Sequence, residues 1–213
     1  MRNELLGILL LAILSLGIGT GCASMGAPGA TPSSYFGEAR QDGFGRKISE
    51  WQQRADVPRG AKVSNAASAA DTDFAAFAQQ RRRQIARDLV AFSQKQAETV
   101  FIEDGGVDHW ATVKSTLRRG QEDCDGLELL VFAALRKAGF DSAKVYRAIV
   151  VEGDTLQHHM VTLWFEDPRD PWVLDSTGAM TDSMVRMSEV PSWSALRVFT
   201  ETKQFTVQYG QRS

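Results

Sequence analysis

The chain has 213 residues, of which 43% are hydrophobic and 23% charged, so it can bury one sizeable core and is neither collagen-like nor disordered throughout. Its net charge is -2, from 24 basic and 26 acidic side chains, which excludes the basic surplus expected of a nucleic-acid-binding protein. Only two residues are cysteine, which excludes a disulfide-rich scaffold and a zinc site built from several thiolates.

The N-terminus is organised like a bacterial lipoprotein signal. Residues 5–18 are apolar, but this stretch is shorter than the roughly 20 residues that a membrane-spanning helix needs. Small residues then lead into Cys22, as in the lipobox that is cleaved before a lipid-modified cysteine, although Gly19 stands where leucine is usual. We expect a signal peptide over 1–21 and a lipid on Cys22, with ordinary secretion or an uncleaved anchor as alternatives. Because Ala23 follows, the resemblance to Gram-negative sorting signals favours the inner leaflet of the outer membrane.

Residues 22–73 are predicted to form a lipid-anchored tether and a weakly ordered segment. Ala, Ser, Gly and Pro dominate residues 23–34, a composition that cannot bury enough apolar surface to offset the entropy of ordering. A short helix around 46–54 is predicted here, and residues 60–73 are again rich in Ala and Ser. The predicted domain therefore covers 74–213.

Helices come first in this domain and strands follow. Helical spacing of apolar residues predicts a helix over 73–98, with the arginines at 81–83 on its solvated side. A second apolar stripe begins at Cys124, with Asp123 as a suitable N-cap and Gly139 as a suitable stop. After these helices the apolar period changes to two, which predicts strands over 145–151, 159–165, 171–175 and 199–209, with a short helix near Met184. Helices followed by strands in this order indicate an α+β fold.

Cys124 is the first residue to which we assign chemistry. Cysteine reacts as its thiolate, and the first turn of a helix favours the thiolate through the helix dipole and unpaired backbone N–H groups. If Cys22 carries a lipid, Cys124 is the sole thiol of the mature chain in an oxidising compartment. The alternative is a buried cysteine that acts as a small hydrophobic side chain.

A base and its orienting acceptor are predicted on neighbouring strands. Strand alternation separates His159 from His158 and places it on the face expected to pack against the Cys124 helix. Asp175 ends the next strand and would orient the imidazole, although the connection pairs it nearer Thr162 than His159. The alternatives are a core histidine with one hydrogen-bond partner and an aspartate that caps a turn. The apolar residues on the His159 face are Val161, Leu163 and Phe165.

Five short motifs occur in a fixed order between residues 75 and 205. They are Asp108-His109-Trp110-Ala111-Thr112, Leu117-Arg118-Arg119-Gly120, Asp123-Cys124-Asp125, His159-Met160-Val161 and Leu174-Asp175. In this order they resemble the bacterial transglutaminase-like cysteine peptidases of the LapG type. The resemblance implies a papain-like or transglutaminase-like core, in which the nucleophile helix packs on an antiparallel sheet, and a triad of Cys124, His159 and Asp175.

The acids around the cysteine depart from the family pattern. The family usually carries Gly before the Asp-Cys pair and Glu-Asp after the cysteine, whereas this chain has Glu122, Asp125 and Gly126 at these positions. The resemblance implies a Ca²⁺ site that uses Asp123 and Asp125. Carboxylates beside a thiol raise its pKa, so Ca²⁺ or a neighbouring arginine is needed to offset them. The alternative is that both acids cap the helix.

The expected function is that of a periplasmic, lipid-anchored thiol peptidase, a hydrolase that cleaves an envelope or surface protein. Cys124 attacks an amide carbonyl, His159 transfers the proton and Asp175 orients His159. The oxyanion is held by the Cys124 N–H and a second donor, for which Gln121 is a candidate. The alternatives are a transglutaminase or amidase with the same triad and a non-catalytic binding module of the same fold. No cofactor other than Ca²⁺ and no nucleic-acid partner is expected.

Overall fold

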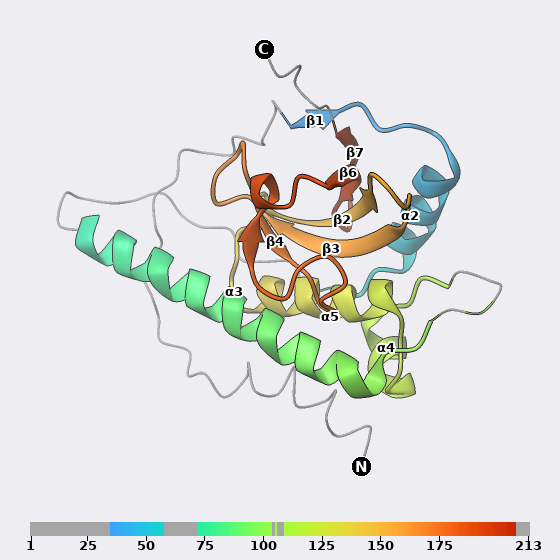
Figure 1. The fold of residues 1–213 in the computed structure, drawn as a ribbon, viewed down its shortest axis with the longest axis horizontal. Helices are drawn as coiled ribbons and strands as arrows, with labels where there is room; N and C mark the ends of the chain where they lie inside the picture. Colours follow the sequence, from blue (N-terminus) through green and yellow to red (C-terminus); the bar gives the residue numbers. More distant parts are fainter. Residues whose placement is uncertain (1–34, 58–71, 104, 106–108, 208–213) are drawn as a thin grey trace.

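The computed structural model describes residues 35–57, 72–103, 105 and 109–207 (Figure 1). The predicted signal peptide, the lipidation site Cys22 and the tether over 23–34 lie outside the described residues. Within the described part of the chain, no helix is both long enough and apolar enough to cross a membrane.

A seven-stranded antiparallel sheet forms the centre of the fold, with strand order β1-β7-β6-β2-β3-β4-β5. Strands adjacent in sequence pair along β2-β3-β4-β5, as expected from the short connections between them. The predicted α+β fold with an antiparallel sheet is confirmed. The strands are β1 (Phe36–Gly37), β2 (Val145–Glu152), β3 (His158–Trp164), β4 (Trp172–Leu174), β5 (Val185–Arg186), β6 (Trp193–Phe199) and β7 (Gln204–Val207).

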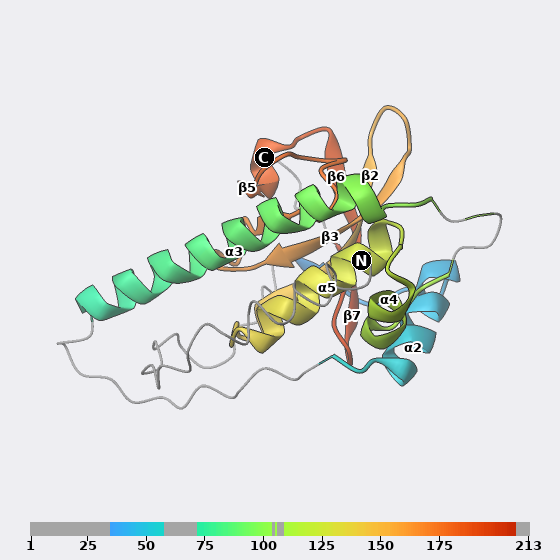
Figure 2. The same ribbon diagram turned by 90° about the horizontal axis from the view of Figure 1, so that it is seen from below.

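Helices cover one face of this sheet. α5 packs on β2 and β3, and α3 packs on α5 and β4, so that α3 and α5 run together beneath the sheet (Figures 1 and 2). The N-terminal half of α3 extends beyond the sheet (Figure 1). The helices are α2 (Gly43–Arg54), α3 (Thr72–Val100), α4 (Val113–Arg119), α5 (Cys124–Lys137) and the short 3₁₀ helix η2 (Met187–Glu189).

α5 begins and ends where the sequence predicts. The Asp123 carboxylate accepts the backbone N–H groups of Asp125 and Gly126, as an N-cap does. After the C-cap residue Ala138, Gly139 takes a φ of +83°, a left-handed conformation that suits glycine. Cys124 is therefore fixed as the first helical residue.

β3 has apolar side chains buried on both faces, and this overturns one prediction. Met160 and Trp164 lie in the cluster that includes α5, whereas Val161, Leu163 and Phe165 lie in the cluster on the opposite face. The prediction that the latter three pack against the Cys124 helix is therefore wrong. Alternation separates the two faces of a strand but does not show which one meets a helix when both are apolar.

The folded unit begins before residue 74. Residues 35–57, expected to precede the domain, supply β1 and α2, and the side chains of Ile48 and Trp51 are fully buried in the helix-side core. Gln52 Nε2 donates to the Thr200 carbonyl at 2.8 Å, which fastens α2 to the turn between β6 and β7. The predicted helix over 46–54 is present within α2.

Three other predicted elements differ from the structure. The strand predicted over 199–209 is the end of β6 and then β7, because the chain turns at Thr200, whose N–H donates to the Lys203 carbonyl. The short helix near Met184 is β5 followed by η2. The arginines at 81–83 do not all face solvent, since Arg83 pairs with Glu166 at 2.8 Å.

Candidate active site

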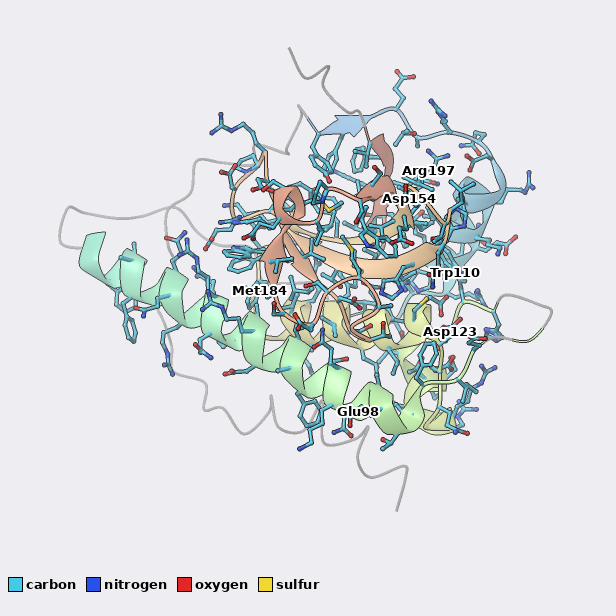
Figure 3. All side chains as sticks on the ribbon, in the orientation of Figure 1. Glu98, Trp110, Asp123, Asp154, Met184 and Arg197 are labelled. Atoms are coloured by element: carbon cyan, nitrogen blue, oxygen red, sulfur yellow. The ribbon has the colours of Figure 1, made fainter. Side chains whose placement is uncertain are left out.

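Cys124 lies half-buried at the N-terminal end of α5. Asp123, the residue before it, lies on the same side of the domain as Trp110 (Figure 3). The backbone N–H of Met160 in β3 donates towards the Cys124 sulfur, which places the thiol beside the residue that follows His159. Burial, followed by the charges of Asp123 and Asp125, raises the pKa of the thiol to about 12. The free thiol is therefore protonated at neutral pH and needs a base to become a nucleophile.

His159 and Asp175 form a buried pair. His159 Nε2 lies 2.9 Å from Asp175 Oδ1, and the side chains are 4% and 0% exposed. The β3-β4 register pairs Thr162 with Leu174, so Asp175 follows the last pair on the side towards His159. The His159 imidazole reaches the Asp175 carboxylate diagonally across the two strands. Asp175 thus lies next to Thr162 in the register, as the sequence analysis expected, and still reaches His159.

A turn of backbone N–H groups surrounds the Asp175 carboxylate. Burial by itself would raise the pKa of Asp175, but the hydrogen bond and charge of His159 and the N–H groups of the turn outweigh it and hold the pKa at about 2. Turn-capping and His159 orientation, predicted as alternatives, therefore occur together. The backbone donors are Thr177 at 2.9 Å and Gly178 at 3.1 Å to Oδ1, and Met180 at 2.7 Å and Thr181 at 3.2 Å to Oδ2.

Two further contacts hold this end of the sheet in place. Gln94 of α3 donates from Nε2 to the Asp175 carbonyl at 3.0 Å, and the Trp193 ring meets the His159 ring edge-on at 6.1 Å between centroids. His158, by contrast, is exposed and packs against Phe44. Because Asp175 occupies Nε2 of His159, Nδ1 is the ring nitrogen that remains for the thiol.

The Cys124 thiol and the His159 imidazole lie at neighbouring residues of the open edge of β3, on different faces of the strand. β4 pairs with β3 only from Thr162 onward, so among the described residues no strand covers His158–Val161 on that side. The Cys124 sulfur receives the Met160 N–H from the helix face, while His159 projects from the other face. This arrangement can deliver a proton acceptor to a helix-borne thiol.

The acids beside Cys124 have different surroundings. Asp123 uses its carboxylate to cap α5, whereas Asp125 is 3% exposed and neither carboxylate oxygen meets a hydrogen-bond partner among the described residues. Ca²⁺ takes about 6–8 oxygen ligands. The described residues contain no group of three or more His, Cys, Asp or Glu side chains arranged for a metal ion, so Asp123 and Asp125 alone fall short of such a site.

Asp125→Asn is expected to remove a pH-dependent loss of stability. Burial, then the neighbouring Asp123 carboxylate, raises the pKa of Asp125 from 3.8 to about 9. The folded state thus keeps a proton that the unfolded chain has released, and unfolding becomes easier as the pH rises between these values. Between pH 5 and pH 8 we expect the wild type to lose about 4 kcal/mol of unfolding free energy that the variant does not lose.

Urea unfolding at both pH values measures this difference. The cost of burying the asparagine amide is the same at pH 5 and pH 8, so it cancels in the comparison. Equal pH dependence in the two proteins would show that Asp125 is ionised in the folded state.

Gln121, the candidate oxyanion donor, lies half-buried between α4 and α5, and its role stays a prediction. Asp123 takes the N–H groups of Asp125 and Gly126, whereas the Cys124 N–H has no hydrogen-bond partner in the described part of the chain.

Sequence reasoning missed two buried charges near the site, Glu128 and Arg147. Glu128 interrupts the apolar stripe of α5, and a charge in such a stripe is the signal that could have revealed it.

Solved structures with a similar fold include LapG from Legionella pneumophila, at 15% identity and a TM-score of 0.49, covering 76% of this chain and 86% of that one. Calcium-bound LapG from the same organism has 15% identity and a TM-score of 0.48, covering 79% and 92%. A Cytophaga hutchinsonii protein described as a candidate cysteine protease has 12% identity and a TM-score of 0.33, covering 61% and 49%. No protein-family model and no curated protein matches the chain.

Proposed function

We propose that this protein is a thiol peptidase that cleaves a protein of the cell envelope through Cys124, His159 and Asp175. The observation that carries the proposal is the buried His159–Asp175 pair, held by a turn of N–H donors, at the strand edge that receives the helix-borne thiol. A histidine oriented by a carboxylate beside a thiol is the arrangement used in nucleophilic acyl transfer.

The reaction begins with proton transfer from the thiol. Because the thiol pKa lies near 12, His159 Nδ1 accepts the proton as the sulfur attacks the amide carbonyl. The Nε2–H bond to Asp175 stabilises the imidazolium that forms. His159 then returns the proton to the leaving amine, and water releases the acyl group from Cys124. The Cys124 N–H donates to the oxyanion, with Gln121 proposed as the second donor.

Cells that express the wild-type chain and cells that express Cys124→Ala provide the test. Mass spectrometry of protein N-termini in the envelope fraction should show new termini only with the wild type. Identical termini in both strains would reject the peptidase, whereas new lysine-glutamine cross-links would identify the transglutaminase alternative. Hydrolysis of a small-molecule amide, with release of its amine and no change in any protein, would identify the amidase alternative.

The proposal includes a lipid anchor at Cys22 and a periplasmic location. Both come from the N-terminal sequence, with its apolar segment and its small residues before the cysteine. Labelling with a radioactive fatty acid should mark the wild-type chain and leave Cys22→Ala unlabelled. A soluble, unlabelled wild-type chain would contradict the anchor.

Calcium dependence is the third part of the proposal. Asp123 and Asp125 flank the nucleophile but supply too few oxygens by themselves, so backbone carbonyls and water would have to complete the Ca²⁺ shell. A cation held there would counter the charges that raise the thiol pKa. Chelation with EGTA should lower the cleavage rate, and Ca²⁺ should restore it. Cleavage that is indifferent to EGTA would reject the metal and leave the triad unaffected.

A further inference from the structure

A buried polar network lies directly behind Cys124. Arg147 of β2 is 1% exposed, and its Nε donates to Oε2 of Glu128, which is fully buried, at 2.5 Å. Arg147 Nη2 donates to the backbone carbonyl of Asp125 at 2.8 Å. The second oxygen of Glu128 accepts the Thr162 hydroxyl at 2.6 Å. One guanidinium and one carboxylate thus join three elements of the fold.

The partners of this network lie close in sequence to the triad. Asp125 follows Cys124 directly, and Glu128 lies one helical turn further along α5. Thr162 lies three residues after His159 on β3. The network therefore connects the peptide next to the nucleophile with the strand that carries the base.

Aromatic rings hold the guanidinium in place. The Arg147 guanidinium carbon lies 4.7 Å from the ring centroid of Trp51, 5.3 Å from that of Phe199 and 5.8 Å from that of Trp110. The planar fork is rigid and gives directional hydrogen bonds. A buried ion pair adds little net stability, because desolvation of both charges offsets their attraction. Stability alone therefore gives no reason for charges at this place.

We propose that Arg147 and Glu128 are positioning residues of the active site. They hold the first turn of α5 against β2 and β3, and in this way set the separation between the Cys124 thiol and the His159 imidazole. The inference rests on the proposed function, since it assigns the network a role in that site. A displacement of about 1 Å between reacting groups lowers a rate by about 100-fold.

A second buried ion pair on the same helix offers a matched control. Arg136 Nη2 lies 3.1 Å from Glu201 Oε1, and the side chains are 3% and 10% exposed. Arg136 lies in the last turn of α5, at the end opposite Cys124. Arg136→Met therefore disrupts a comparable ion pair and should destabilise the fold without moving the nucleophile.

The test is a double-mutant cycle read out by Cys124 alkylation with iodoacetamide at pH 7, on full-length protein well below its unfolding temperature. Arg147→Met should slow alkylation by about 10- to 100-fold. His159→Ala should slow the wild type but have little further effect in the Arg147→Met background, because the thiol and imidazole are already misplaced. Arg136→Met should leave both the rate and the His159 effect unchanged.

Two milder variants address the case in which Arg147→Met does not fold. Thr162→Val removes only the hydroxyl that joins Glu128 to β3, and Glu128→Gln keeps the shape of the side chain. Each should reduce the effect of His159→Ala on the alkylation rate. If the effects of His159 and network substitutions are additive, the positioning role is wrong. If His159→Ala leaves wild-type alkylation unchanged, the triad itself fails.

Discussion

Exchange of His159 for Ala is expected to lower the rate of peptide cleavage by about 1,000-fold, within the 100- to 10,000-fold range of general acid-base catalysis. The physical reason is the thiol pKa near 12, which leaves almost no thiolate at neutral pH. His159 is the buried base beside this thiol, and Asp175 stabilises its charged form. Without the imidazole, water must accept the proton of the Cys124 thiol.

The measurement is kcat/KM at pH 7 for a peptide that spans the cleavage site found in the envelope comparison. His158→Ala is the matched control, because this neighbouring histidine is exposed and packs only against Phe44 among the ring contacts of the described residues. It should retain wild-type activity. Equal losses in the two variants would show that the activity depends on the integrity of the strand rather than on the His159 imidazole.

Local signals predicted the helix that carries the nucleophile. The apolar stripe after Cys124, the capping carboxylate of Asp123 and the left-handed Gly139 each act within a few residues, so sequence proximity is sufficient to recognise them. The His159–Asp175 pair could also be predicted, since the two polar residues lie at the ends of apolar runs on strands joined by a short connection.

Long-range contacts decided what the sequence analysis missed. β6 contains Arg197, which is 3% exposed and pairs with Asp42, a residue far away in sequence that also caps α2. A charge in a short alternating segment argues against a buried strand unless its partner is known. The same holds for Arg147 and Glu128, whose opposite charges satisfy each other only after β2 packs on α5.

Replacement of Asp175 is expected to affect stability and catalysis together. Asp175→Ala removes the acceptor of the buried His159 and of four backbone N–H groups in the turn, which is half-buried or exposed. The loss of a buried charged group that makes several hydrogen bonds lowers the free energy of unfolding by about 3–5 kcal/mol. We expect the cleavage rate of the folded fraction to fall about 100-fold, because the imidazole loses its orientation and the group that stabilises its charge.

The same carboxylate predicts acid sensitivity. Its pKa is about 2 in the folded state and 3.8 without these contacts, so the folded state binds the proton less tightly than the unfolded chain. The stabilisation is therefore complete above about pH 4 and is lost as the pH falls through 2. Urea unfolding between pH 6 and pH 2 should show a wild-type loss of about 2 kcal/mol that Asp175→Ala lacks. Equal losses in both proteins would place the acid-sensitive group elsewhere.

Asp175→Asn separates the two roles. Both carboxylate oxygens accept N–H groups, so an amide in either orientation turns its own NH₂ against backbone donors. The orientation with fewer conflicts puts NH₂ against Met180 and Thr181 and keeps the oxygen on His159 Nε2. We therefore expect Asn to lose about 2–3 kcal/mol of stability, yet to retain more activity than Ala, by about tenfold. If Asn is as inactive as Ala, the negative charge of Asp175, and not its orientation of the ring, is what catalysis requires.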